Sequence, residues 1–272
     1  MKESKFSHIH PGFFMKVSII TVALNNAEYI EACIQSVINQ DYKNIEYIVI
    51  DGGSTDGTND IIKKYEDKIN IWISEPDEGM YDAINKGIGM SSGDIIGILH
   101  SDDLYIDEHV IGNIVQEFLN NVDSVYADLV YVERNNLNNV VRYYDSSVFQ
   151  VSKFAYGWMP AHPTCFIKKN VYDKYGLYKT NYIIAADFEL LARFYAKHRV
   201  SYSYLQKVIV KMRNGGLSTR NFKSNFILNR EIVRACRENG IETNIFKVYS
   251  KYFVKLSQLF KRPRQVEPPC LK

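Results

Sequence analysis

Cysteines are few in this 272-residue chain, and long apolar runs are absent. The four cysteines are widely scattered, and no two have the spacing of a redox motif or a metal site. Reduced thiols in a cytosolic compartment are the simplest interpretation. No uninterrupted apolar run approaches the roughly 20 residues of a membrane-spanning helix. The polar N-terminus lacks the apolar centre of a signal peptide, so we expect a cytoplasmic protein without a membrane span.

An excess of one charge is also missing. The chain has 33 basic and 31 acidic residues, whereas a dedicated nucleic-acid-binding protein normally has a strong basic excess. We therefore expect no nucleic-acid partner. The hydrophobic share of 46% and the charged share of 24% are ordinary for a soluble protein. The length suits one large α/β domain with an appendage, or two small domains.

In the first part of the chain, apolar β-branched segments alternate with segments of helical periodicity. The pattern predicts strands over residues 16–23, 45–50, 69–74 and from 95 onward. It predicts helices over residues 28–39, from the turn 51–58 to 65, and over 80–90. Strands and helices that alternate at this spacing indicate βαβ units and a parallel sheet.

The pattern changes after Asp103. Residues 107–120 are predicted to be helical, and residues 124–133 and 140–144 alternate like a β-hairpin. We place the hairpin turn at four asparagines, Asn135, Asn136, Asn138 and Asn139. Further on, the pattern predicts a helix over 186–198, strands over 200–204 and 208–212, and helices over 222–238 and 244–260. These mixed pieces suggest a second half that completes a cleft.

The segment 95–103 begins with an apolar run and ends in the adjacent carboxylates Asp102 and Asp103. Ligands of open parallel sheets bind beyond the carboxyl ends of the strands. Mg²⁺ and Mn²⁺ prefer carboxylate oxygens, and Mg²⁺ is usually shared with the phosphates of a substrate. We therefore predict a divalent-metal site here. The alternative interpretation is that these acids only cap the following helix.

Three acidic clusters follow predicted strands or begin a helix: Asp51, Asp102 with Asp103, and Asp187 with Glu189. Together they suit a nucleotide-dependent transfer. One acid would contact the nucleobase of the donor, one would bind the metal, and one would accept a proton as the general base. Asp187 suits the last role because apolar neighbours raise the pKa of a carboxyl by desolvation. The alternative interpretation is that Asp187 is only the N-cap or a first-turn acid of the following helix.

At these motifs the chain resembles the inverting family-2 glycosyltransferases of GT-A fold, over about residues 16–220. The closest likeness is to bacterial members that build surface polysaccharides of colanic-acid and O-antigen type. The matching segments are Val17-Ser-Ile-Ile-Thr21, Val49-Ile-Asp-Gly-Gly-Ser-Thr-Asp-Gly-Thr58, Glu75-Pro-Asp-Glu-Gly-Met-Tyr-Asp-Ala-Ile-Asn-Lys-Gly87, Gly93-Asp-Ile-Ile-Gly-Ile-Leu-His-Ser-Asp-Asp103, the segment around His162, and Ala185-Ala-Asp-Phe-Glu-Leu-Leu-Ala-Arg193.

The resemblance implies a role for each matching residue. Asp187 falls on the catalytic base, and Asp102 and Asp103 fall on the metal site, with Mg²⁺ or Mn²⁺ as cofactor. His162, Glu189 and Arg213 are expected near the acceptor or the donor sugar. The implied contacts to the donor nucleotide are Thr21, Asn25, Asp51, Asp82, Lys86 and Asp102.

The chain departs from the family pattern at four positions. His100 replaces the first acid of the Asp-X-Asp motif, and Gly52 replaces the second acid of the turn after Asp51. Ile84 stands where many members have an arginine, so Lys86 or Arg213 is expected to serve the phosphates instead. Ala186 replaces the glutamate before the catalytic acid. Neither the metal carboxylate nor the base is lost.

The C-terminal segment is basic. Lys247, Lys251 and Lys255 repeat every four residues and therefore share one helix face. A basic amphipathic helix is typical of binding to a membrane surface, and the alternative is a helix that packs on the catalytic domain. The loop 213–220 is either a lid over the donor or a plain surface turn.

The resulting fold class is α/β: a GT-A domain with a Rossmann-like nucleotide-binding half and a mixed central sheet, plus a C-terminal helical extension. We divide the chain into an N-terminal extension (1–15), the GT-A domain (16–220) and the helical segment (221–272). The expected activity is a metal-dependent, inverting transfer of a hexose or N-acetylhexosamine. The expected donor is UDP-linked, and the expected acceptor is a lipid-linked saccharide at the inner face of the cytoplasmic membrane.

Two other functions remain open. A sugar nucleotidyltransferase would need a glycine-rich basic loop after the first strand, and residues 21–26 lack one. A catalytically silent member that binds nucleotide or glycan as an assembly partner is favoured by His100. The intact Asp102 and Asp187 argue against that alternative.

Overall fold

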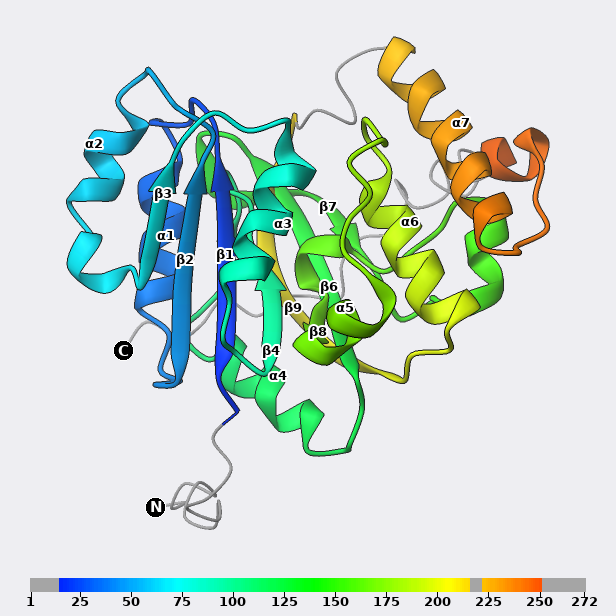
Figure 1. The fold of residues 1–272 in the computed structure, drawn as a ribbon, viewed down its shortest axis with the longest axis horizontal. Helices are drawn as coiled ribbons and strands as arrows, with labels where there is room; N and C mark the ends of the chain where they lie inside the picture. The colour runs from blue at the N-terminus through cyan, green and yellow to red at the C-terminus, as the bar shows by residue number, and fades with distance from the viewer. Residues whose placement is uncertain (1–14, 216–221, 251–272) are drawn as a thin grey trace.

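A nine-stranded mixed sheet organises the computed structural model, which describes residues 15–215 and 222–250 (Figure 1). The strand order is β3-β2-β1-β4-β8-β6-β9-β5, and β7 pairs with β6. The strands are β1 (Val17–Ala23), β2 (Ile45–Asp51), β3 (Ile71–Ser74), β4 (Ile95–Ile98), β5 (Leu104–Tyr105), β6 (Ser124–Glu133), β7 (Asn136–Tyr144), β8 (Phe166–Lys168) and β9 (Tyr202–Arg213).

The helices lie on both faces of this sheet. They are α1 (Ile30–Ile38), α2 (Thr58–Lys63), α3 (Met80–Met90), α4 (Val110–Phe118), α5 (Lys169–Tyr175), α6 (Ala186–Ala192) and α7 (Phe222–Glu238). A π-helical turn, Arg193–Lys197, continues α6. Short 3₁₀ helices occur at Glu66–Lys68, Val151–Tyr156 and His162–Thr164.

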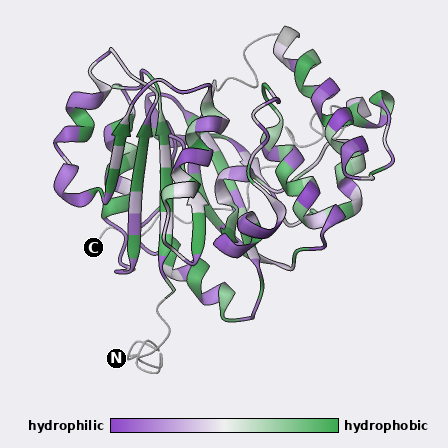
Figure 2. Ribbon diagram, in the orientation of Figure 1, coloured by the Kyte–Doolittle hydropathy of each residue, from purple (hydrophilic) through white to green (hydrophobic). Residues whose placement is uncertain are grey.

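The first four strands form the predicted parallel block, because β1 pairs in parallel with both β2 and β4, and β2 with β3. Their side chains alternate between two cores, as strand geometry requires. Ile20 and Val22 of β1 face the core that contains α3, whereas Val17 and Ile19 face the core that contains α1 and α4. Figure 2 shows hydrophobic residues concentrated along these strands. Asp51 is the last residue of β2, and Asp102 follows β4, so both acids lie at the same edge of the sheet.

The second half is mixed, as predicted. The short strand β8 runs antiparallel to both β4 and β6, while β6 and β9 are parallel. Helices α6 and α7 pack side by side at the far end of this half (Figure 1). Apolar residues of α7 join the core that also contains α3 and α6; they are Ile232, Val233, Ala235 and Cys236. The beginning of the C-terminal segment therefore shares a core with the sheet.

Several local predictions were wrong. Residues 136–139 belong to β7, so the hairpin turn is Arg134 and Asn135 instead of the asparagine cluster. The two strands expected over 200–204 and 208–212 are one strand, β9, interrupted by a register shift at the exposed Gln206 and Lys207. The pattern also missed α5, β8 and β5, which are too short for reliable periodicity.

Part of the predicted C-terminal helix is seen. Residues 245–250 are helical; Val248 is fully buried in the core, whereas Phe246 is 83% exposed. Residues 251–260, with Lys251 and Lys255, lie outside the described residues, as do residues 1–14 and 216–220 of the proposed extension and lid. Within the described residues, each helix is too short or too polar to cross a membrane.

Candidate active site

The first candidate residue, Asp51, ends β2 and is saturated by protein donors. Its Oδ2 accepts hydrogen bonds from the backbone N–H groups of Gly53 and Ser54, at 3.0 and 2.9 Å. The same oxygen accepts from Asn59 and Ser74, at 3.1 and 2.7 Å, and Oδ1 accepts from the Ser54 hydroxyl. Burial acts to raise the pKa of Asp51, but these bonds outweigh it, and the net pKa is lowered. A base contact through this carboxylate would have to use Oδ1, which accepts a single hydrogen bond from the protein.

Thr21 and Asn25, two further predicted contacts to the nucleotide, have partners within the protein. Thr21 is fully buried and faces α1, where its hydroxyl lies 3.8 Å from the Cys33 sulfur and accepts a bond of 3.2 Å from Tyr47. Strand alternation explains this, since Thr21 lies on the same face of β1 as Ile19. Asn25 has a left-handed φ of 48°, and its Oδ1 accepts the Thr55 N–H at 2.9 Å. Asn25 therefore joins the turns that follow β1 and β2.

Asp82 and Lys86 lie one turn apart on α3. The Lys86 ammonium is 3.4 Å from the Asp82 carboxylate and 3.0 Å from that of Glu75. These two carboxylates raise the pKa of Lys86. The lysine is only partly exposed and stays cationic, so a phosphate would have to compete with two acids for it.

Asp102 follows β4, and its carboxylate makes no hydrogen bond or ion pair with the residues that the structure describes. Its backbone carbonyl accepts a 2.6 Å bond from the Arg213 guanidinium, which also lies over the Tyr29 ring at 4.6 Å. Arg213 thereby holds the turn that presents Asp102. Burial lowers the pKa of the neighbouring His100, and the charge of Asp102 acts to raise it.

Asp103 is fully buried, and neither carboxylate oxygen has a partner of hydrogen-bond geometry among the described residues. Burial, and then the charge of Asp102, raises the pKa of Asp103 well above its usual range. Buried carboxylate oxygens without partners are atoms that a divalent cation would satisfy, so the donor set fits Mg²⁺ or Mn²⁺. No group of three or more acidic, histidine or cysteine side chains could hold a metal within the described ranges. Oxygens of a bound diphosphate would have to complete the coordination.

A series of aromatic and polar neighbours leads from this turn to Ile184, in the loop before Asp187. The rings of His100 and His162 are 6.1 Å apart, and His162 Nε2 lies 2.7 Å from the Tyr178 hydroxyl. Tyr178 stacks on Tyr81 at 5.9 Å, and the Tyr81 hydroxyl donates a 2.5 Å bond to the carbonyl of Ile184. Burial, with a smaller contribution from His100, lowers the pKa of His162 to about 3. His162 is a buried neutral link in this path.

Asp187 is the second residue of α6. The pKa of its carboxyl is raised to about 6, chiefly by burial. The N–H of Phe188 donates to Oδ1 at 2.7 Å and acts to lower this pKa, whereas the charge of Glu231 acts to raise it. The helix begins after Ala185 and has no side-chain cap, so Asp187 is an acid of its first turn and not its N-cap. A partly exposed carboxyl with a pKa about two units above its ordinary value suits a general base.

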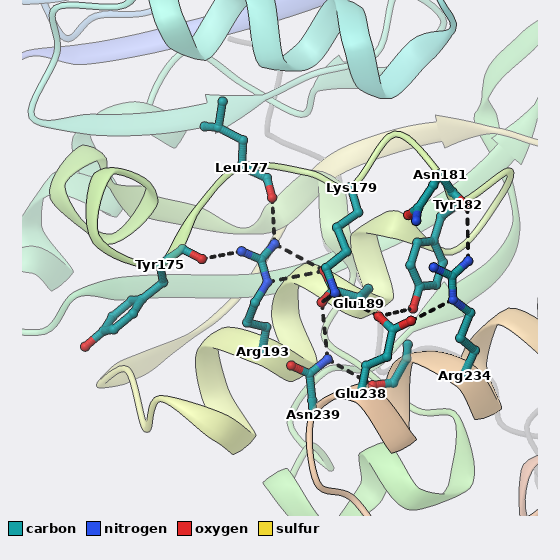
Figure 3. Close-up of polar contacts among 11 residues, drawn as sticks. Tyr175, Leu177, Lys179, Asn181, Tyr182, Glu189, Arg193, Arg234, Glu238 and Asn239 are labelled. Carbon is teal, nitrogen blue, oxygen red and sulfur yellow. Dashed lines mark hydrogen bonds and ion pairs between the residues drawn. The ribbon is translucent and has the colours of Figure 1, made fainter.

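Glu189 has structural partners (Figure 3). Its carboxylate is fully buried and forms ion pairs with Arg193 at 3.1 Å and Lys179 at 2.8 Å, and a hydrogen bond with Asn239 at 3.3 Å. These contacts join α6 to the end of α7 and leave no exposed oxygen for a sugar. The helical period from Asp187 explains the difference, since a residue two positions away points to the opposite side.

Sequence reasoning missed two residues beside Asp187. Tyr81, on α3, was quoted only as part of a motif, and Glu231, on α7, was not singled out. The Glu231 carboxylate accepts backbone N–H groups from the loop before α6 at 2.7–2.9 Å. No local sequence pattern indicates these contacts. Glu231 lies 46 residues or more along the chain from its partners, and Tyr81 lies 103 residues from Ile184.

The geometry thus combines a partly parallel α/β sheet, acids at its strand ends and a carboxyl with a raised pKa at the start of α6. The sequence model of Glycosyl transferase family 2 matches residues 18–176, which is more than half of the chain. The chain therefore belongs to glycosyl transferase family 2. The match ends before Asp187 and α7.

The relatives include an uncharacterized glycosyltransferase of Mycobacterium tuberculosis, which is 35% identical over 179 residues, covering 65% of this chain and 68% of that protein. A PGL/p-HBAD biosynthesis glycosyltransferase of Mycobacterium bovis is 25% identical over 77% of this chain and 82% of its own length. An uncharacterized glycosyltransferase of Rickettsia typhi is 32% identical over 81% of this chain and 69% of its own length.

Solved structures confirm the expected GT-A type of fold. S. aureus TarS 1-349 in complex with UDP has a TM-score of 0.63 and 17% identity, covering 88% of this chain and 72% of that one. The mannosyltransferase PcManGT from Pyrobaculum calidifontis, in complex with GDP-Man and Mn²⁺, has a TM-score of 0.64 and 19% identity, covering 91% and 72%.

Proposed function

We propose that this family-2 glycosyltransferase moves a sugar from a UDP-linked donor to a hydroxyl of a saccharide acceptor, with inversion at the anomeric carbon. The observation that carries the proposal is Asp187, whose carboxyl has a pKa raised to about 6 by burial. His162, Tyr178 and Tyr81 lie between the turn that carries Asp102 and the loop that leads to Asp187. The site thus pairs a base with a region for an activated leaving group.

In the proposed reaction, Asp187 accepts the proton of the acceptor hydroxyl while that oxygen attacks the anomeric carbon. The bond from this carbon to the diphosphate oxygen breaks, and the nucleoside diphosphate leaves with the electron pair. One displacement with the base opposite the leaving group inverts the centre, as in inverting glycoside hydrolysis. A divalent cation held by Asp102 and Asp103 would supply Lewis-acid stabilisation of the diphosphate charge.

The neighbours' ligands support the choice of donor. TarS 1-349 has been solved with UDP and with UDP-GlcNAc, and PcManGT with GDP-Man and Mn²⁺. A UDP-linked hexose or N-acetylhexosamine, with Mg²⁺ or Mn²⁺, is therefore our first candidate. GDP-mannose is the first competitor.

A pocket of about 290 Å³ on α7 supports the choice of acceptor. It is lined by Phe226, Ile227, Arg230, Glu231 and Arg234. Guanidinium groups beside apolar side chains suit an anionic group attached to an apolar chain, such as a lipid-linked saccharide. The relative named for PGL/p-HBAD biosynthesis is compatible with a cell-envelope product. We therefore retain surface-polysaccharide synthesis of colanic-acid or O-antigen type as the proposed setting.

Peripheral binding to the inner face of the cytoplasmic membrane belongs to the same proposal. Phe246 and Tyr249 are exposed in the helical segment 245–250, next to the basic residue Lys247. Phe226 is exposed on α7. Apolar and cationic side chains on one segment favour an anionic lipid surface.

The test is a thermal-shift screen of UDP-, GDP- and dTDP-sugars with and without Mn²⁺, on the wild type and on Asp102→Ala. A bound ligand stabilises the folded protein by mass action. We expect one nucleotide class to stabilise the wild type only with Mn²⁺, and Asp102→Ala to lose this stabilisation. Equal metal-dependent stabilisation of both proteins would contradict the assignment of Asp102.

Turnover then separates the alternatives. We expect the enzyme to consume the bound donor, and we expect NMR to show a product with inverted anomeric configuration. Binding without turnover towards any saccharide would favour the silent assembly partner. Formation of a nucleotide sugar from a sugar phosphate and a nucleoside triphosphate would favour the nucleotidyltransferase.

A further inference from the structure

Glu231 on α7 contacts the loop that leads into the base-bearing helix. The side chain is only 9% exposed. One carboxylate oxygen accepts the N–H of Ile183 at 2.7 Å, and the other accepts those of Ile184 and Ala185 at 2.9 Å each. N–H groups at the start of a helix have no partner inside the helix, and a carboxylate there is also favoured by the helix dipole. Glu231 thus binds the backbone N–H groups of the three residues that lead into α6.

A second group holds the same loop from another direction. The Tyr81 hydroxyl, on α3, donates to the carbonyl of Ile184 at 2.5 Å. Ile184 therefore has its N–H fixed by α7 and its carbonyl fixed by α3. Asp187 follows three residues later, and its backbone position depends on where this loop lies.

Helix α7 also docks through contacts that do not involve Glu231. Figure 3 shows a separate polar cluster at the C-terminal end of α7. There, Glu238 accepts bonds from Lys179 at 2.8 Å, Tyr182 at 2.9 Å and Arg234 at 2.7 Å. The buried apolar residues Ile232, Ala235 and Cys236 add to this anchoring. Glu238 therefore provides a matched control, because it is a glutamate of the same helix that contacts neither Asp187 nor the amides of residues 183–185.

We propose that Glu231 is the positioning residue of Asp187: it fixes the loop 183–185 so that the carboxylate of Asp187 reaches the acceptor hydroxyl. The proposal rests on the proposed function for its catalytic consequence. The structural part, a loop fixed by the Glu231 carboxylate, stands independently. Misplacing a reacting group by about 1 Å costs up to about 10² in rate.

The charge of Glu231 also acts on Asp187. The other titratable groups whose electrostatic interaction with Asp187 is seen are Tyr81 on α3, Tyr144 on β7, Cys165 and Tyr178. Burial raises the pKa of each of these four groups, so they are neutral at physiological pH. Glu231 is therefore the anionic neighbour, and it acts to raise the pKa of Asp187.

The experiment compares the full-length wild type with Glu231→Gln, with the control Glu238→Gln, and with Tyr81→Phe. Hydrogen exchange of the amides of residues 183–185 reports on the loop without any ligand. An NMR titration of the Asp187 carboxyl reports its pKa. Steady-state rates with UDP-GlcNAc or GDP-mannose and Mn²⁺, whichever the wild type consumes, report on positioning.

We expect Glu231→Gln to speed exchange at the three amides by about tenfold or more and to lower the pKa of Asp187. We also expect it to reduce kcat by about tenfold or more at unchanged donor KM. Glu238→Gln should do none of these, although it loses comparable thermal stability. Tyr81→Phe should speed exchange in the same loop, and it keeps the test open if Glu231→Gln does not fold.

Unchanged exchange in both Glu231→Gln and Tyr81→Phe would overturn the structural part, whatever the enzyme does. Faster exchange with unchanged kcat, or an equal loss of kcat in Glu238→Gln, would overturn the positioning role. If the wild type consumes no donor, the proposed function fails, and hydrogen exchange still decides whether Glu231 holds the loop.

Discussion

Asp51 and Asp187 are both carboxylates at element ends, but their surroundings give them opposite properties. Asp51 accepts bonds from two backbone N–H groups and from three side chains, and its pKa is lowered. Asp187 accepts one bond from its neighbour's N–H, and burial raises its pKa to about 6. A saturated carboxylate stabilises the fold, whereas an under-satisfied one is available for a proton. We therefore expect the amide variant of Asp187 to lose catalytic rate and the amide variant of Asp51 to lose stability.

The largest effect is expected at Asp187. Asp187→Asn keeps the shape and loses the basicity, and removal of a general base typically costs about 10²–10⁴ in rate. The variant should bind donor as the wild type does and should be at least as stable at pH 8, because burying the ionised carboxylate costs free energy. Single-turnover rates and thermal unfolding check both statements. A variant with the wild-type rate would leave Asp187 with no role in catalysis.

The next effect concerns Glu189, whose sequence position suggested a sugar contact. Breaking a buried ion pair from one side typically costs about 3–5 kcal/mol. Glu189→Ala should therefore lower the free energy of unfolding by that amount, because Arg193 and Lys179 lose their buried partner. Denaturant unfolding measures it. A stable Glu189→Ala variant with a raised donor or acceptor KM would restore the sugar-binding role.

Asp51→Asn should reverse the pattern of Asp187→Asn. An amide nitrogen facing the donors of the turn leaves them unsatisfied, at a cost of about 1–3 kcal/mol. We expect lower stability, with kcat largely retained below the unfolding temperature. Calorimetry measures the loss of stability, and the rate assay used for Asp187→Asn measures kcat. Thr55→Ala, in the same turn, is the control. A large loss of kcat in a stable Asp51→Asn variant would give both acids the same kind of role.

The pH dependence of stability separates the two acids further. The folded pKa of Asp51 is below its ordinary value, so its contribution is present above about pH 4 and is lost as the pH falls through the folded pKa. The folded pKa of Asp187 is raised to about 6, so its contribution is present below about pH 4 and is lost as the pH rises through about 6. Urea unfolding from pH 3 to 8 should show Asp187→Asn gaining stability over the wild type as the pH rises.

The smallest effect is expected at the membrane. Phe246→Ser should weaken binding to anionic vesicles by about tenfold, because insertion of an apolar side chain is worth roughly 1.5–3 kcal/mol. Leu119→Ser, an exposed apolar residue at the end of α4, is the control. Co-sedimentation at low and high salt separates the apolar part from the screened cationic part. Identical sedimentation of both variants would place any membrane contact on another surface.

The sequence was sufficient for features that depend on local periodicity. The alternation of β1 and the helical period of α3 predicted those elements closely, and the apolar neighbours of Asp187 predicted its desolvation. Alternation could also have placed Thr21 inside, on the face of Ile19. The hydrogen bonds of Asp51 include one from Ser74 of the next strand, and the loop before α6 is bound by Glu231, from a helix 46 residues further along the chain. Such contacts follow from tertiary packing, and no local pattern encodes them.

The most direct measurement is a titration of the Asp187 carboxyl by ¹³C NMR, set beside the pH dependence of kcat/KM for the donor that the screen identifies. The account predicts a pKa of about 6 for Asp187. It also predicts that kcat/KM falls below that same pH, because a base must be ionised to accept a proton. An Asp187 pKa near the ordinary value of about 4, or an acid limb that persists unchanged in Asp187→Asn, would contradict the assignment of Asp187 as the base.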